Sequence, residues 1–258
     1  MCPAMCGRFL NRLPPAEIAR LFATGKIVPN YPARSNIAPT DPVLAVRFNA
    51  KTGERRLDAL RWGLVPYWAK DLSIGARLIN ARAETLATLP AFRDAFQRRR
   101  CLIPASGFYE WRKDGKTRTP YAVLPADEPL FAFAGLWENW RDPSTRAKDA
   151  DAPWVRSCTI VTAEPNALLA PIHSRMPVIL PREAWAQWLG ETPADAAALQ
   201  ALLTPYPAER MRVYPVAPRV NSVKNDDPSL LASPQSGDRG RAAAVCETQT
   251  AEARTEQE

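Results

Sequence analysis

The sequence predicts one α+β domain made mostly of antiparallel strands, with short helices between them. The 258 residues include 26 prolines but only 11 glycines. A residue type that cannot donate a backbone N–H, present at this frequency, excludes long helices, coiled coils and helical repeats. Short apolar segments of strand length are also separated by proline, glycine and polar turn residues along most of the chain, which is typical of interspersed strands and short helices.

Composition excludes several other classes of protein. Apolar residues make up 46% and charged residues 24% of the chain, which is ordinary for a soluble globular protein. No apolar run approaches the roughly 18 residues of a membrane span. Residues 1–10 hold no apolar stretch long enough for a signal peptide, so we expect a cytoplasmic protein.

The first half of the chain is expected to hold two helices and several strands. Pro14-Pro15 suits the start of a helix and Gly25 suits its end. Asp114-Gly115 predicts a turn between two strands. In chain order, the expected elements are a helix over 16–22, a hairpin over 43–49 and 55–62 around Lys51-Thr52-Gly53, a helix over 84–99 interrupted at Pro90, strands over 101–111, 120–124 and 130–137, and a polar flexible loop over 141–153.

The second half is expected to add three strands and two helices. Thr192 is the predicted N-cap of the second helix, with Pro193 at its first position and Asp195 three residues on. The expected elements are strands over 154–163, 176–180 and 211–216, and a first helix over 181–189. Beyond Leu231 almost no apolar residues remain. We therefore expect a domain over 6–231, a disordered tail over 232–258, and an extension over 1–5 that is removed or lies before the true start.

The charge of the chain permits binding to a polyanion. The formal net charge is +7, and the tail from Ala232 carries three arginines against five acidic residues, so the body carries +9. A basic body is compatible with phosphate contacts to nucleic acid. The five cysteines are odd in number, lack a Cys-x-x-Cys spacing, and accompany one histidine. We therefore expect free thiols, no metal site and no cofactor.

Cys6 is the first candidate for chemistry. It directly follows Met5, so removal of the preceding residues would leave a free α-amine beside the thiol. An α-amine has a pKa of about 7.7–8.0, so a useful fraction is neutral and nucleophilic at pH 7. The thiolate is a strong nucleophile. The alternative is a terminal cysteine without a role.

Glu110 and His173 are the candidate proton-transfer groups. Glu110 lies between Tyr109 and Trp111, and desolvation by aromatic neighbours should raise its pKa toward the range useful for acid–base catalysis. His173 is the only histidine and lies in a loop-like segment. A solvent-facing glutamate and a structural histidine are the alternatives.

Asn80 and Arg82 should project together from an extended segment, because residues i and i+2 share a face. They would offer an amide and a guanidinium suited to phosphate. The alternative is an ion pair between Arg82 and Glu84. Tyr67 and Trp68 lie in loop-like sequence beside basic residues, which suits base stacking on a single strand, whereas Trp62 is expected to be core.

Seven short motifs then occur in a fixed order. They are Cys6-Gly7-Arg8-Phe9, Asn36-Ile37-Ala38-Pro39-Thr40, Arg61-Trp62-Gly63-Leu64-Val65-Pro66, Ile79-Asn80-Ala81-Arg82-Ala83-Glu84-Thr85, Cys101-Leu102-Ile103-Pro104-Ala105, Gly107-Phe108-Tyr109-Glu110-Trp111 and Ile172-His173-Ser174-Arg175-Met176-Pro177. Together they resemble the SOS response-associated peptidase family, the abasic-site processing proteins. The resemblance runs from Cys6 to about Asp226.

The resemblance implies a partly closed β-barrel core and a basic groove for single-stranded DNA. It implies that Cys6 becomes the N-terminal residue and bonds covalently to the aldehyde of an abasic site. The matching active-site positions are Cys6, Asn80, Arg82, Glu110 and His173. The matching positions near DNA are Arg8, Asn36, Pro39, Trp68, Thr162 and Arg175, together with Arg82.

The chemistry expected from this resemblance is thiazolidine formation. The Cys6 amine condenses with the aldehyde to an imine, and the thiol closes the ring. Glu110 is expected to exchange protons, Asn80 to hold the terminus, His173 to assist proton transfer and Arg82 to bind a phosphate. The family usually begins Met-Cys-Gly-Arg, whereas Met1-Cys2-Pro3-Ala4 precede Met5 here. Translation from Met5 and self-cleavage before Cys6 both remain open.

Two other function classes remain open from the sequence. One is an N-terminal-cysteine peptidase or amidohydrolase that acts without DNA. The other is a single-stranded DNA-binding module in which the cysteine has no role. The favoured reading is a monomeric DNA-damage protein that acts on abasic single-stranded DNA.

Overall fold

The computed structural model describes residues 6–25, 29–146, 151 and 153–233. The expected extension over 1–5 and most of the expected tail lie outside the described residues. The same holds for part of the expected loop over 141–153, whose first residues form α3 (Pro143–Arg146).

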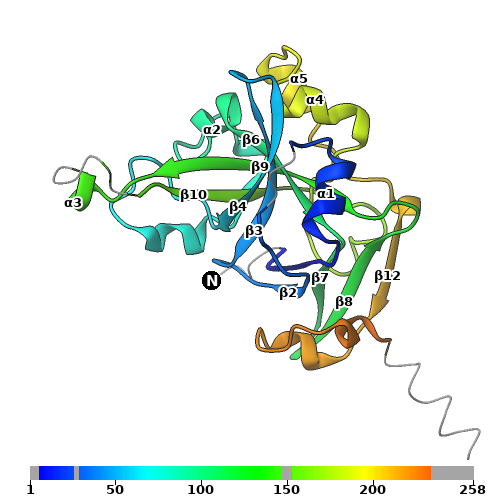
Figure 1. Cartoon of the computed structure of the whole chain (residues 1–258). Coiled ribbons are helices and arrows are strands. Elements are labelled where there is room, and N and C mark those ends of the chain that lie inside the picture. The colour runs from blue at the N-terminus through cyan, green and yellow to red at the C-terminus, as the bar shows by residue number, and fades with distance from the viewer. Residues whose placement is uncertain (1–5, 26–28, 147–150, 152, 234–258) are drawn as a thin grey trace, which may run out of the picture.

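Within the described residues, twelve strands form two sheets, and the larger sheet closes into a barrel (Figure 1). In the larger sheet, β10, β4, β3, β6 and β9 follow one another, and β9 pairs again with β10. The barrel strands are β3 (Pro42–Asn49), β4 (Glu54–Trp62), β6 (Arg100–Ala105), β9 (Phe131–Trp140) and β10 (Val155–Ala163). Two short strands, β5 (Asn80–Arg82) and β11 (Met176–Pro177), pair with β10. The predicted α+β class and the barrel core implied by the resemblance are therefore confirmed.

The second sheet has five antiparallel strands in the order β12-β8-β7-β1-β2. They are β1 (Arg8–Asn11), β2 (Arg34–Ile37), β7 (Gly107–Asp114), β8 (Thr117–Pro125) and β12 (Met211–Pro215). Phe9 of β1 joins this sheet to the barrel, because its ring packs edge-on against Trp62 at 5.1 Å and against Phe133 at 6.0 Å between ring centroids. All three side chains are buried. This anchoring fixes the N-terminal strand beside β7.

The helices are short and peripheral, as the proline content predicts. They are α1 (Pro15–Leu21), α2 (Arg93–Arg98), α3, α4 (Trp185–Leu189) and α5 (Ala196–Ala201), with 3-10 turns η1 (Leu72–Arg77), η2 (Ala83–Thr85), η3 (Arg182–Ala184), η4 (Ala208–Arg210), η5 (Pro218–Asn221) and η6 (Pro228–Leu231). Trp62 lies in the core, as expected, and is fully buried.

Three local predictions were wrong. The expected strand over 101–111 is two strands, because the chain leaves the barrel at Ser106 and joins the second sheet at Gly107, where a Cβ atom would lie 2.7 Å from the carbonyl oxygen of Val123. The expected helix over 84–99 is helical only in η2 and α2, because Pro90 separates them. The N-cap of α5 is Asp195 and not Thr192, since the Asp195 carboxylate accepts the Ala198 N–H at 2.7 Å.

Candidate active site

Cys6 and Glu110 meet where β1 runs beside β7. Arg8 lies opposite Tyr109 in this antiparallel pair, and this register carries the chain back toward Glu110. The backbone nitrogen of Cys6 donates to Oε1 of Glu110 at 2.9 Å. Cys6 is 1% exposed and Glu110 is 2% exposed. Residues 104 positions apart thus form one buried pair.

The electrostatics of this pair are set by burial. Burial raises the pKa of Glu110 from 4.5 to about 8, although the backbone N–H groups of Cys6 and Trp111 act in the opposite direction. Burial also raises the pKa of the Cys6 thiol, and the charge of Glu110 raises it further. The predicted desolvation of Glu110 is confirmed. A carboxyl group with a pKa near neutrality can both donate and accept a proton at physiological pH.

The backbone at Cys6 is strained. Its φ of 35° lies in the left-handed region, where only two other non-glycine residues of the described chain, Ala23 and Thr40, are found. An L-residue costs roughly 1–2 kcal/mol in this conformation. The strain falls on the residue whose nitrogen contacts Glu110.

His173 lies on the connection between β10 and β11, over residues 164–175. Its Nδ1 lies 3.2 Å from the backbone nitrogen and 3.3 Å from the carbonyl oxygen of Arg175, and burial lowers its pKa. The backbone N–H of His173 donates to the carbonyl oxygen of Leu169 at 2.9 Å. These contacts fix the position of His173, and its lowered pKa favours the neutral imidazole.

These groups border a cavity of about 650 Å³, within the size range of small-molecule sites. The lining residues are Gly7, Arg8, Pro39, Glu110, Trp111, Lys113, Arg118, Ile172, His173, Ser174 and Asn221. Four residues predicted from sequence, Arg8, Pro39, Glu110 and His173, thus share one cavity. The cavity lies beside the buried nitrogen of Cys6.

Arg8 fixes one wall of the cavity. Its guanidinium donates to the side-chain oxygen of Asn36 at 3.0 Å, to the carbonyl oxygen of Val220 at 2.8 Å and to that of Asn221 at 3.1 Å. The indole N–H of Trp111 donates to the side-chain oxygen of Asn221 at 2.7 Å. The segment around η5 is thereby fastened against β1 and β7.

Asn36 stabilises the same wall from the interior of the protein. Its side chain is fully buried, and its Nδ2 donates to the carbonyl oxygens of Val220, Ser222 and Asn225 at 3.2, 3.1 and 2.8 Å. These hydrogen bonds hold in place the backbone segment that forms the cavity wall.

Asn80 and Arg82 lie on β5, which runs parallel to β10 with Asn80 opposite Ile160 and Arg82 opposite Thr162. Ala81 between them is buried and Arg82 is exposed. The expected extended geometry is therefore confirmed. Neither Asn80 nor Arg82 lines the cavity.

Glu84 forms its ion pair with Arg175 and not with Arg82. The two guanidinium nitrogens of Arg175 bind the two carboxylate oxygens at 2.7 and 2.9 Å, and Nη2 also donates to the carbonyl oxygen of Thr162 at 2.5 Å. Hydrogen bonding to Arg175 lowers the pKa of Glu84. Thr162 is fully buried. This pair joins η2, which follows β5, to the loop of His173.

Exposed aromatic side chains lie on the loop after β4. Tyr67 is 56% exposed and Trp68 is 48% exposed, and neither lines the cavity. Because large exposed aromatic rings suit stacking on unpaired bases, their exposure is compatible with the expectation from sequence.

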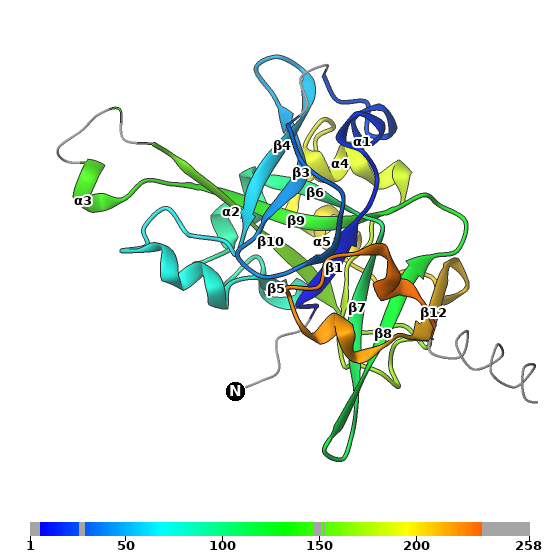
Figure 2. The same ribbon diagram turned by 60° about the horizontal axis from the view of Figure 1, so that its bottom comes forward.

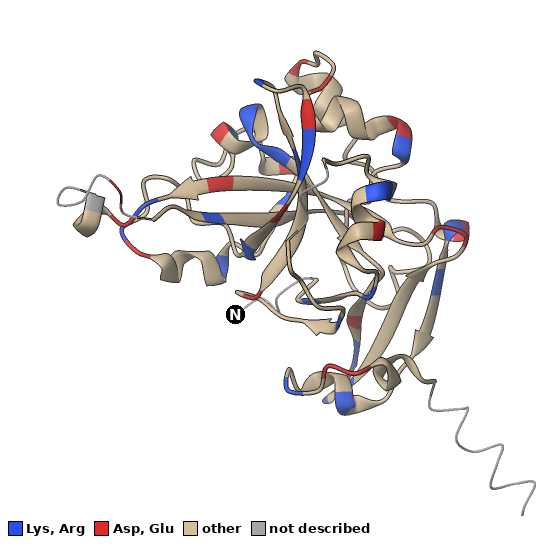
Figure 3. Cartoon of the chain, viewed as in Figure 1, with Lys and Arg blue, Asp and Glu red and all other residues tan. Residues whose placement is uncertain are grey.

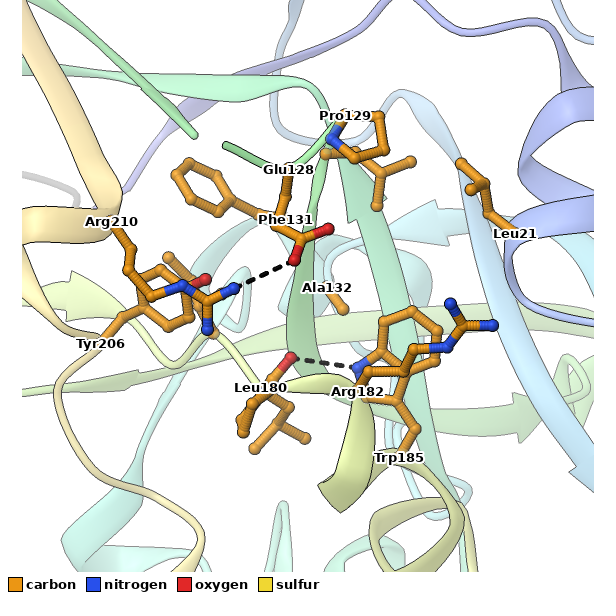
Figure 4. Close-up of a pocket in the computed structure, with 13 residues that line it drawn as sticks. Leu21, Glu128, Pro129, Phe131, Ala132, Leu180, Arg182, Trp185, Tyr206 and Arg210 are labelled. Carbon is orange, nitrogen blue, oxygen red and sulfur yellow. Dashed lines mark hydrogen bonds and ion pairs between the residues drawn. The ribbon is translucent and has the colours of Figure 1, made fainter. Parts of the chain in front are cut away.

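A second pocket is too small and too apolar to be the candidate site for a nucleotide. It measures about 60 Å³ and is lined by side chains such as Phe131, Trp185 and Tyr206. The Arg210–Glu128 ion pair, at 3.0 Å, crosses its rim (Figure 4). This volume corresponds to roughly two waters of bulk liquid. A nucleotide does not fit there.

Sequence reasoning missed three lining residues, Lys113, Arg118 and Asn221. The predicted turn at Asp114-Gly115 could have placed the first two opposite each other. Nothing local marks Asn221, which reaches the cavity through contacts with residues over 100 positions away. Within the described residues, no three His, Cys, Asp or Glu side chains gather as metal ligands, and no helix is long and apolar enough to span a membrane.

Comparison with known proteins gives consistent matches. The sequence profile described as "SOS response associated peptidase (SRAP)" matches residues 5–223. The chain is 42% identical over 232 residues to "Abasic site processing protein YoqW" of Bacillus subtilis, covering 89% of this chain and all of that protein. It is 31% identical to "Abasic site processing protein YedK" of Escherichia coli, covering 88% and 99%. A crystal structure of a Bacteroides thetaiotaomicron protein shares the fold, with a TM-score of 0.77 at 24% identity, over 88% of this chain and 99% of that one.

Proposed function

Because this chain belongs to the SOS response-associated peptidase family, we propose that it processes abasic sites in DNA by bonding covalently to them through Cys6. The observation that carries the proposal is the 2.9 Å contact between the Cys6 nitrogen and a buried carboxylate whose pKa is near neutrality. An amine at this position has its proton acceptor already in place. The names of the relatives support abasic sites as the substrate.

The reaction begins with release of the Cys6 α-amine. Its nitrogen is an amide while residues precede it, and an amide cannot form an imine. Cleavage before Cys6 also removes the φ torsion of this residue, so the strain at φ 35° disappears on processing. We propose that the chain is active only once Cys6 is its first residue, whether through self-cleavage or another route.

The covalent steps balance without a cofactor. The amine adds to the C1′ aldehyde of the ring-opened sugar, and the carbinolamine loses water to give an imine. The thiol sulfur then bonds to C1′ while its proton passes to the nitrogen, which closes a five-membered thiazolidine. In the thiazolidine, C1′ has only single bonds. Because no C=N group remains to promote β-elimination, the strand stays intact.

Glu110 supplies the proton transfers. It accepts a proton from the Cys6 ammonium, which frees the neutral amine to attack, and as the acid it then donates a proton to the departing hydroxyl of the carbinolamine. His173, which lines the same cavity, assists proton transfer, and Asn80 positions the Cys6 terminus. Such general acid–base assistance contributes typically 10²–10⁴-fold.

Basic and aromatic residues would hold the DNA. We propose that Arg82 binds a backbone phosphate and that Trp68 stacks on an unpaired base, since both are exposed. Arg8, Asn36 and Thr162 support the site through buried contacts. Pro39 borders the cavity, and Arg175 reaches DNA when its ion pair with Glu84 exchanges for a phosphate. Single-stranded DNA is the substrate that this arrangement favours.

A denaturing gel tests the function directly. Single-stranded DNA with one abasic site should give a heat-stable shifted band with the processed protein. The matched control is the same oligonucleotide with a tetrahydrofuran abasic analogue, which binds but has no aldehyde and should give no shifted band. Equal bands from both, or none from the natural site, would contradict the proposal, and the second result would favour a peptidase that acts without DNA.

A further inference from the structure

Two positive side chains face each other across the β7–β8 hairpin. Lys113 lies directly opposite Arg118 in the antiparallel register, so their Cβ atoms lie roughly 4.5–5.5 Å apart and their charges repel. Both are exposed. No acidic side chain in the described part of the chain lies within ion-pair distance of either one.

Elsewhere the described arginines often have acidic partners. Arg47 binds Asp58 at 2.7 Å on the barrel, and Arg175 binds Glu84. A like-charged cross-strand pair without a counter-charge is destabilising by itself. An anion bound between the two side chains would convert this repulsion into attraction.

The pair shares a cavity with the proposed reacting groups. Lys113 and Arg118 both line the cavity that Glu110 and His173 also line, and the hairpin projects beyond the rest of the molecule (Figure 2). Acidic and basic residues are spread over the whole chain in Figure 3. The hairpin is thus distinguished by where its charges lie and not by their number.

The other two cations of the hairpin do not line the cavity. The guanidinium of Arg112 lies 5.3 Å from the ring centroid of Tyr121, and Lys116 follows Gly115 in the turn. Neither lines the cavity. One hairpin therefore carries two cations at the cavity and two away from it, which provides a matched control.

We propose that Lys113 and Arg118 together bind a backbone phosphate next to the abasic nucleotide, as the DNA strand enters the cavity. This rests on the proposed function. A phosphate is the anion that accompanies every nucleotide, and phosphate contacts fix position without reading sequence. Arg82 on β5 lies outside the cavity lining, so the strand is held at two separate points around the reacting sugar.

The first test measures binding of undamaged single-stranded DNA at several salt concentrations. Each lost phosphate contact reduces the slope of log K against log salt by about 0.7 for single strands. The double variant Lys113→Ala with Arg118→Ala should show a slope reduced by about 0.7. The control Arg112→Ala with Lys116→Ala should keep the wild-type slope. Equal slopes in all three proteins, or equal reductions in both variants, would overturn the proposal.

The second test locates the phosphate relative to the lesion. The abasic oligonucleotides have nucleotides on only the 5′ side or only the 3′ side of the abasic site. The rate of crosslinking is measured at DNA concentrations below saturation. The double variant Lys113→Ala with Arg118→Ala should crosslink more slowly than wild type on oligonucleotides that keep one flank. It should crosslink at the wild-type rate on oligonucleotides that keep the other flank. A defect of the same size with both flanks would overturn the proposal. Failure of wild type to crosslink any abasic DNA would instead contradict the proposed function, while the salt slopes still decide the hairpin's role.

Discussion

Two buried glutamates on strands of this protein have different electrostatic surroundings. Glu138 on the barrel is 4% exposed and binds Arg99 at 2.7 Å. Its pKa is raised by burial, while the charge of Arg99 opposes the rise. Glu110 on the second sheet is equally buried, yet its pKa reaches about 8 with only backbone N–H groups opposing the rise. The barrel pairs its buried carboxylate with an arginine, whereas Glu110 has no positive partner among the residues that the structure describes, as the proposed proton transfer requires.

The cysteines repeat this contrast. Cys101 and Cys158 lie inside the barrel core, and burial raises the pKa of Cys101 to about 12 and that of Cys158 well above its ordinary value. These two thiols serve as small apolar side chains. Cys6 is equally buried but contacts Glu110 beside a cavity. The three buried thiols therefore differ in their neighbours and not in their burial.

The largest expected effect is the difference in crosslink formation between a substitution of Cys6 and one of a barrel cysteine. Cys6→Ser keeps the α-amine but replaces the thiol with a poor nucleophile, so the stable crosslink should be almost completely lost. An imine should remain trappable by borohydride, and strand cleavage should rise because the imine persists. The measurement is a denaturing gel of abasic single-stranded DNA, with and without borohydride.

Cys158→Ser is the matched control for this substitution. It should crosslink like wild type, while the buried hydroxyl lowers the free energy of unfolding by about 1–3 kcal/mol. Heat-stable crosslinks from Cys6→Ser at the wild-type level would show that the thiol is not the trapping group.

The second effect separates the two glutamates. Glu110→Gln should slow crosslink formation by about 10²–10⁴-fold, because the amide cannot exchange protons. Glu138→Gln should leave the rate unchanged and reduce stability, since Arg99 loses its partner. Single-turnover rates and urea unfolding of both variants check this. Comparable rate losses in the two variants would remove the distinction between the site and the barrel.

The third effect is a pH dependence of stability in the chain that retains the residues before Cys6. The folded pKa of Glu110 is raised, so the folded state binds more protons than the unfolded state between pH 4.5 and about 8. Stability should therefore fall as pH rises through this window, by at most about 1.4 kcal/mol per pH unit from this group. Urea unfolding at several pH values measures it. Glu110→Gln should flatten this part of the profile, and an unchanged profile would argue against a buried, neutral Glu110.

The smallest effect concerns a single phosphate contact. Arg82→Ala should weaken binding of undamaged single-stranded DNA and reduce the salt slope by about 0.7. Arg47→Ala, on the barrel and paired with Asp58, should leave the slope unchanged. A normal slope for Arg82→Ala in a folded protein would assign Arg82 a role other than phosphate binding.

The fold could be predicted as far as local patterns decide it. The hairpin of β3 and β4 and the strand β10 follow from alternation and turn residues, and the structure has them within a residue or two of the prediction. The break at Ser106 could not be found this way, because Gly107 after it packs closely against Val123 on a strand that comes later in the chain. The cap at Asp195 could not be separated from Thr192, since both residues suit an N-cap.

In the candidate site too, features set by local sequence could be predicted and contacts between distant segments could not. The aromatic neighbours of Glu110 in sequence predict its raised pKa, and the unique His173 draws attention to its loop. The contact between Cys6 and Glu110, the ion pair between Glu84 and Arg175, and the wall built by Asn221 all join segments far apart in the chain. The pairing of β1 with β7, the packing of η5, and the pairing of β5 and β11 with β10 bring these segments together.

The most direct test of the central claim is mass spectrometry of the crosslinked product after protease and nuclease digestion. The account predicts a peptide that begins at Cys6 and carries the abasic sugar with the loss of one water, as a thiazolidine requires. An adduct on another residue, or on a peptide that still contains Met5, would contradict the claim that the Cys6 amine and thiol together capture the lesion.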